Sequence, residues 1–142
     1  MIKETTKKPF KMGPLQEAWV QYLEKHPEKQ GKQQLGYKTT DGKKVRMCCL
    51  GAMCHVYYRS KKKRVPWTNE GVLCDTDTGK GSSHLLSNIW EKIGLNGPSG
   101  LLPDIRLQGY STLTEANDMG VSWSEIAKFI RKNPKAVFSK PV

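Results

Sequence analysis

Apolar residues near the start of the chain recur every three to four positions, which predicts an amphipathic helix. Its apolar face comprises Leu15, Ala18, Trp19, Tyr22 and Leu23. Pro14 suits an early helical position, where a helix needs no backbone N–H donor. The helix should end at His26-Pro27, because the residue before a proline is driven out of the helical conformation.

The next segments predict a β-hairpin and a buried helix. Asp41-Gly42 is a strong turn dipeptide, and the flanking strands should cover about Gln34–Lys38 and Lys43–Met47. The sequence CCLGAMCHVY at residues 48–57 is apolar nearly all round, which is typical of a buried helix. The run RSKKKR at residues 59–64 follows it, and positive charge is favourable at a helix C-terminus.

Helical signals also dominate the second half. Two short strands are expected in residues 65–74, then a polar loop at residues 75–83 and one short strand near Ile105–Leu107. A third helix should present Leu85, Leu86, Ile89, Trp90 and Ile93 and stop at Gly94. Two final helices are punctuated by capping-box patterns at Thr112–Glu115 and Ser122–Glu125, by a break at Gly120 and by Asn133-Pro134.

These elements predict an α+β fold in which four to five helices surround a small antiparallel sheet. A flexible basic arm at residues 1–13 should precede one compact domain at residues 14–142, since the 142-residue chain is of single-domain size. The predicted core residues are Trp19, Leu50, Met53, Ile89, Trp90, Ile126 and Ile130. No export signal or membrane-spanning run is visible, so we expect a cytoplasmic protein without a membrane partner.

Positive charge is concentrated in the first half of the chain. Residues 1–64 hold 16 Lys and Arg against five Asp and Glu, a net charge of +11, whereas residues 65–142 hold eight of each. Such asymmetry is typical of proteins that contact nucleic acid or another polyanion. It is also compatible with a surface that merely keeps the protein soluble.

The candidate anion-binding residues therefore lie mostly in this half. They are Lys43, Lys44, Arg46, Tyr58, Arg59, Lys61, Lys62, Lys63 and Arg64, with Lys80 added from the polar loop. Aromatic rings beside Lys and Arg suit base stacking combined with phosphate neutralisation, although Tyr and Trp are more often core residues. We expect removal of Lys61–Arg64 to weaken anion binding without unfolding the domain.

The cysteines offer a second kind of chemistry. A thiol at the start of the 48–57 helix, Cys48 or Cys49, would have its pKa lowered by the helix dipole and could act as a nucleophile with His84 as base. Together with Cys54, Cys74 and His55, these residues could supply enough ligands for a zinc ion, but their spacing lacks the paired pattern of structural zinc sites. Buried reduced thiols are the simpler interpretation, and we expect neither a metal nor a cofactor.

Two further motifs are weak. The loop DTDTGKGSS could bind phosphate through backbone N–H groups, but its spacing is not that of a Walker A loop. The two C-terminal helices could form a helix-turn-helix that offers Ser122, Ser124, Lys128 and Arg131 to DNA. Against this, Trp123 would then be exposed, and this half of the chain carries no net positive charge.

Several of these segments resemble a group of small bacteriophage proteins over roughly residues 15–132. The clearest marks are the CCLGAMC run at residues 48–54 and the Asn117-Asp118-x-Gly120 run that leads to Glu125-Ile126-Ala127. The resemblance implies a compact α+β domain and an accessory role such as host takeover or counter-defence. It implies no reaction and no catalytic residues.

Three functions remain open at this point. The sequence favours a non-enzymatic protein that binds nucleic acid or a nucleotide through its basic half. One alternative is a protein that inhibits a host defence enzyme, with the charge steering association. The other is a cysteine-dependent hydrolase.

Overall fold

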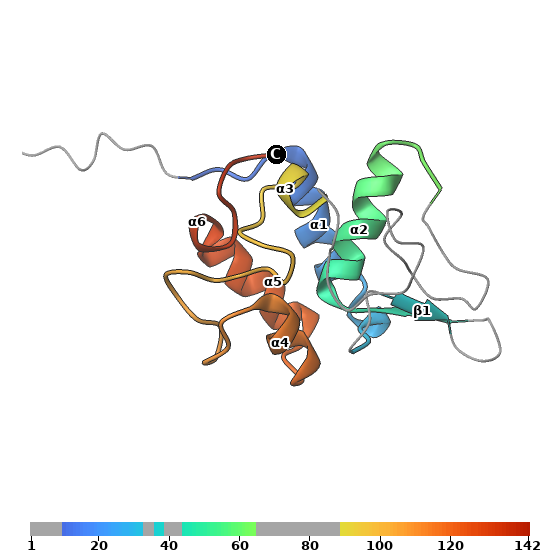
Figure 1. Ribbon diagram of the computed structural model, residues 1–142. Helices are drawn as coiled ribbons and strands as arrows, with labels where there is room; N and C mark the ends of the chain where they lie inside the picture. The colour runs from blue at the N-terminus through green and yellow to red at the C-terminus, as the bar shows by residue number, and fades with distance from the viewer. Residues whose placement is uncertain (1–9, 33–35, 39–43, 65–88) are drawn as a thin grey trace, which may run out of the picture.

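Helices α1 (Pro14–Lys25) and α2 (Cys49–Ser60) lie side by side, and α1 also packs on α5 (Trp123–Lys132) (Figure 1). The computed structural model describes residues 10–32, 36–38, 44–64 and 89–142. Its other elements are η2 (Pro27–Lys29), β1 (Gly36–Lys38), β2 (Val45–Met47), α3 (Ile89–Lys92), α4 (Leu113–Asp118) and α6 (Pro134–Val137). The α+β prediction is confirmed, with six α-helices in these ranges rather than four to five.

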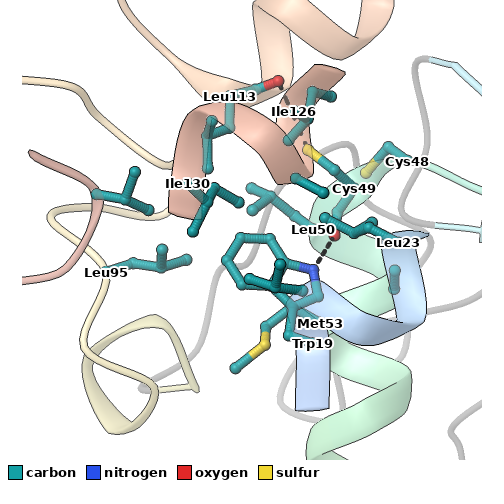
Figure 2. Packing of buried hydrophobic residues seen from close by; sticks show 14 of the residues in the cluster. Trp19, Leu23, Cys48, Cys49, Leu50, Met53, Leu95, Leu113, Ile126 and Ile130 are labelled. Atoms are coloured by element: carbon teal, nitrogen blue, oxygen red, sulfur yellow. Dashed lines mark hydrogen bonds between the residues drawn. The ribbon is translucent and has the colours of Figure 1, made fainter. Parts of the chain in front are cut away.

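The core lies between α1, α2 and α5, as the apolar patterns predict. Trp19, Leu50, Met53, Ile126 and Ile130 are completely buried, and Figure 2 shows them converging with Leu23, Leu95 and Leu113. The Trp19 indole N–H donates to the Cys49 carbonyl (2.9 Å), so that its polar atom is satisfied inside the core. Among the predicted core residues, Ile89 is buried, whereas Trp90 is only half-buried at the edge of the cluster.

The predicted hairpin is present as a two-stranded antiparallel sheet at one side of the helices (Figure 1). Tyr37 of β1 lies opposite Arg46 of β2. The Asp41-Gly42 turn lies outside the described residues, and so do the strands predicted in 65–74, the loop 75–83 and Leu85 and Leu86 of the third helix. Its described part, α3, ends at Lys92, and Gly94 follows two residues later with a φ of +80°, a conformation that suits the end of a helix.

Two sequence predictions need correction. No strand forms at Ile105–Leu107; Leu107 and Tyr110 form a single bridge around Gln108 and Gly109, whose φ angles of +50° and +90° make a tight turn. The predicted basic arm is also too long. Phe10 packs against the core and stacks on Phe138, with ring centroids 6.3 Å apart, because its apolar ring gains from leaving water.

The C-terminal helices follow their local signals closely. The Thr112 hydroxyl accepts from the Glu115 N–H (3.1 Å) and begins α4, and the Ser122 hydroxyl accepts from the Glu125 N–H (3.2 Å) and begins α5. Gly120 lies between them with a φ of +101°, a conformation that costs glycine little. The apolar stripe of α5, including Trp123, faces the core.

Asn117 is buried and joins three segments that are distant in sequence. Its Oδ1 accepts from the backbone N–H of Cys49 (3.1 Å), the indole N–H of Trp123 (3.1 Å) and the side-chain amide of Gln30 (3.2 Å). Its Nδ2 donates to the Gly31 carbonyl (2.7 Å). Gln30 in turn accepts from the Trp123 backbone N–H (3.0 Å), so that the chain after η2 is fixed to the first turns of α2 and α5.

Gly31 completes this junction because no side chain fits there. Its N–H donates to the Met47 carbonyl (2.6 Å), and a Cβ at this position would lie 2.9 Å from the Cβ of Arg46. A contact that short would force the backbones apart. The glycine therefore allows η2 to lie directly beside β2, which sets the geometry of the surface described next.

Candidate anion-binding surface

A groove of about 580 Å³ lies on the surface formed by α1, η2 and α2. Its lining residues are Ala18, Tyr22, Lys29, His55, Val56, Arg59 and Ser60. Tyr22 lies four residues after Ala18, and Arg59 four residues after His55, so each pair shares one face of its helix. The groove is thus the seam between two helices, with Lys29 of η2 added to its wall. We call it the helical groove.

Tyr22 and His55 occupy this groove among cations. The ring centroids of Tyr22 and His55 are 5.2 Å apart, and that of His26 lies 4.5 Å from Tyr22. Lys29 Nζ lies 5.9 Å from the Tyr22 centroid. Burial, together with the positive charges of Arg59 and Lys29, lowers the pKa of His55, so its imidazole is neutral at neutral pH.

A second hollow of about 380 Å³ adjoins the first, because Lys29 lines both. It is lined by Glu28, Lys29, Lys44, Val45 and Arg46. The two hollows are together lined by four cations from three segments, with Lys29 common to both. We call this the basic surface, defined by Lys29, Lys44, Arg46 and Arg59.

The cationic run continues the basic surface beyond the end of α2. Residues 59–64 are all exposed. Lys61 Nζ lies 5.7 Å from the Tyr57 ring centroid, within the distance of a cation–π contact. Of the predicted anion-binding residues, Lys44 and Arg46 thus line one hollow and Arg59 lines the other, and Lys61–Arg64 follow Arg59 at the end of α2. Lys43 and Lys80 lie outside the described residues.

Tyr58 does not belong to this surface, and its prediction as an anion-binding residue is wrong. Its side chain is buried, with 7% of its area exposed. Tyr58 lies four residues after Cys54, on the face of α2 that packs into the core. Tyr57, one residue earlier, is the half-buried ring at this end of the helix.

The predicted activation of a thiol is also wrong. Cys48 is the N-cap of α2, as expected, and its Sγ accepts from the Gly51 N–H (3.4 Å). Both Cys48 and Cys49 are completely buried, however, and burial raises the pKa of Cys48 to about 12 and that of Cys49 well above its ordinary value. Loss of water outweighs the helix dipole, and both thiols stay protonated.

The remaining ligand candidates do not assemble into a site within the described residues. No group of three His, Cys, Asp or Glu there could hold a metal ion. Cys54 is buried in α2, and His84 and Cys74 lie outside the described ranges. The same is true of the DTDTGKGSS loop.

The helix-turn-helix interpretation loses one of the four residues that it offered to DNA. Arg131, which should face DNA, is paired with Glu17 (2.7 Å) and Glu24 (2.6 Å) of α1. Hydrogen bonds from Arg131 lower the pKa of both carboxyl groups. Trp123, at the position that would meet the bases, is completely buried. Helix α5 thus uses these residues to hold α1.

No protein-family model matches the chain, and no curated protein or solved structure matches it either. The resemblance to small phage proteins therefore stays a prediction. None of the described helices is long and apolar enough to cross a membrane.

Sequence reasoning missed two residues of the basic surface and its groove. Lys29 was counted only as one charge among many, and Tyr22 only as part of an apolar helix face. The pairing of Gly31 with Met47 brings Lys29 beside Arg46, and it has no local signature. His55 was considered for metal binding and for thiol chemistry, but not as a residue of this groove.

The basic run contains one strained residue. Lys62 has a φ of +55°, its N–H donates to the Arg59 carbonyl (3.0 Å), and the Lys63 N–H donates to the Tyr58 carbonyl (2.9 Å). This is the pattern in which helices usually place glycine. We expect Lys62→Gly to raise the free energy of unfolding by about 1 kcal/mol, measured by thermal unfolding. Lys63→Gly is the control; an equal gain there would contradict the explanation.

Proposed function

We propose that this chain is a non-enzymatic binding protein whose basic surface holds the phosphate backbone of a nucleic acid. The observation that supports the proposal is that Lys29 lines both hollows, one of them together with Lys44 and Arg46 and the other together with Arg59. Spaced cations on a continuous surface suit a repeating anion, because each can neutralise a separate phosphate. Within the part of the chain that the structure describes, Glu28 is the single carboxylate that lines either hollow.

The chemistry of the residues that the structure describes favours binding over catalysis. The two thiols considered as nucleophiles are buried and protonated. The phage resemblance, taken together with this surface, supports a proposed role for the binding in host takeover or counter-defence. On that proposal the net charge of +11 also speeds encounter with a polyanion.

The test is the salt dependence of binding to a fluorescein-labelled, 20-nucleotide single strand. Each phosphate contact on a single strand contributes about −0.7 to the slope of log K against log salt, so four contacts predict a slope near −3. Fluorescence anisotropy between 50 and 300 mM NaCl measures this slope. Affinity that stays constant over this range, or no binding at the lowest salt, would overturn the proposal and favour a protein partner.

A further inference from the structure

The helical groove differs from the rest of the basic surface in the balance of its charges. Lys29 and Arg59 enter its wall from different elements, and His55 lies between the helices, while none of the described residues that line it is Asp or Glu. The adjoining hollow, by contrast, has Glu28 beside its cations. Glu28 also lies 3.6 Å from Nδ1 of His26. The helical groove thus gathers positive charge in a concave space with no acidic partner among its lining residues.

His55 carries a second sign of an incomplete site. Its Nδ1 is buried and has no hydrogen-bond partner among the described residues. The charged and titratable groups that face its ring are Arg59 from α2, Tyr22 from α1, and His26 and Lys29 from the segment that follows α1. The charges among them are positive, so they oppose protonation of the imidazole while the groove is empty of an anion.

An anion of high charge density would reverse this balance. A phosphate monoester carries close to two negative charges near pH 7 and three strong acceptor oxygens, whereas an internal phosphodiester carries one charge. The Arg59 guanidinium can donate two parallel hydrogen bonds to such a group, and Lys29 supplies a point charge from the other wall. The groove volume of about 580 Å³ is within the range of small-molecule sites.

We infer that the helical groove binds a terminal phosphate, held between Lys29 and Arg59, with His55 taking up a proton as the phosphate enters. The inference rests on the proposed function when the phosphate ends a nucleic-acid strand. A free nucleoside monophosphate offers the same chemistry, and the experiment separates the two sources.

Proton uptake gives the inference a pH signature. Burial and the surrounding cations lower the pKa of His55 in the free protein, and a dianion beside it raises that pKa again. Binding that takes up a proton becomes tighter as pH falls, by about threefold between pH 7.5 and pH 6.5. The window stops there because the monoester itself loses charge near its second pKa of about 6.

The experiment compares two 12-nucleotide single strands of identical sequence, one with a 5′-phosphate and one with a 5′-hydroxyl. Anisotropy titrations at pH 7.5 and pH 6.5 give the preference for the phosphate. We expect about tenfold at pH 6.5 and less at pH 7.5. Arg59→Gln should remove the preference, and His55→Gln should keep part of it but remove its change with pH. Lys135→Gln, on α6 far from α2 (Figure 1), is the charge-matched control and should keep both.

The outcomes separate this inference from the proposed function. Equal affinity of the two strands, with normal salt dependence, would overturn the terminal-phosphate site and leave the backbone-binding proposal standing. If the preference changes with pH in His55→Gln as strongly as in the parent protein, His55 does not take up the proton, and this result would also overturn the site. If neither strand binds, calorimetric titration with a nucleoside monophosphate decides: binding supports the groove with a free nucleotide, and no heat overturns it.

Discussion

Replacing Asn117 by Ala is expected to lower the free energy of unfolding by about 3–5 kcal/mol. The substitution leaves two buried donors, the Cys49 backbone N–H and the Trp123 indole N–H, without their acceptor, and it also removes the donor to Gly31. A buried polar group without a partner costs about 1–3 kcal/mol. Because domains are stable by only about 5–15 kcal/mol, this variant should be close to unfolding at 37 °C.

Urea unfolding monitored by circular dichroism measures the change, and Asn96→Ala is the matched control. Asn96 is half-buried, and its Nδ2 donates two longer hydrogen bonds, each 3.3 Å, to the carbonyls of Ala136 and Val137. Water can replace these bonds more easily, so we expect a loss of about 1 kcal/mol. Equal losses in the two variants would show that the buried hydrogen bonds of Asn117 stabilise the fold no more than the partly exposed ones of Asn96.

The same junction connects stability to the proposed binding surface. Asn117 and Trp123 hold Gln30, and Gln30 directly follows Lys29, the cation that lines both hollows. Under conditions where the Asn117→Ala protein is still folded, Lys29 should therefore be less well positioned. The Asn117-Asp118-x-Gly120 run therefore helps to position Lys29, a charge that is distant from it in the sequence.

The parts of the fold that depend on local signals were predictable. Thr112 and Ser122 cap their helices as their sequence context indicates, and Gly120 breaks the chain between them. The apolar stripe of α5 faces the core, and so do Trp19 and Leu23 of α1, whereas Ala18 is exposed and Tyr22 is half-buried in the helical groove. These predictions succeed because capping and helical periodicity operate over three to seven residues, a range that sequence alone reveals.

The errors arise where tertiary burial decides. Cys48 occupies the helix N-terminus that was predicted for it, yet complete burial reverses the expected direction of its pKa shift. Tyr58 was grouped with the cations because it is near them in sequence, but its helical phase carries it into the core. In both cases the helix was predicted correctly, but the burial of the side chain could not be predicted from the residues near it in the sequence.

The site depends most on contacts between distant residues. Lys29 reaches Arg46 through the close approach of Gly31 to Met47, and Tyr22 meets His55 only because α1 packs on α2. No local pattern encodes either contact. The sequence therefore revealed how much positive charge the first half holds, but not which cations share a surface.

Replacing Lys29, Lys44, Arg46 and Arg59 together by Gln is expected to weaken single-strand binding by about 100- to 1,000-fold at 0.1 M salt. The estimate follows from counterion release, because a slope of about −0.7 per contact corresponds to about fivefold in affinity for each phosphate at that salt concentration. The slope of log K against log salt should fall toward zero. Circular dichroism and the thermal midpoint should stay close to those of the parent protein, since these cations line hollows rather than the core.

A second quadruple variant, with Lys61–Arg64 replaced by Ala, removes the same number of charges and is the decisive control. These side chains are exposed at the end of α2, and they line neither of the two hollows. Exposed, independently moving side chains lose more conformational entropy when they bind a phosphate, so we expect a loss of only about tenfold. If net charge alone governs binding, the two variants lose equal affinity, and the basic surface has no significance beyond its charge. If the run variant binds as tightly as the parent while the surface variant does not, the run serves solubility and the arrangement around Lys29 carries the binding.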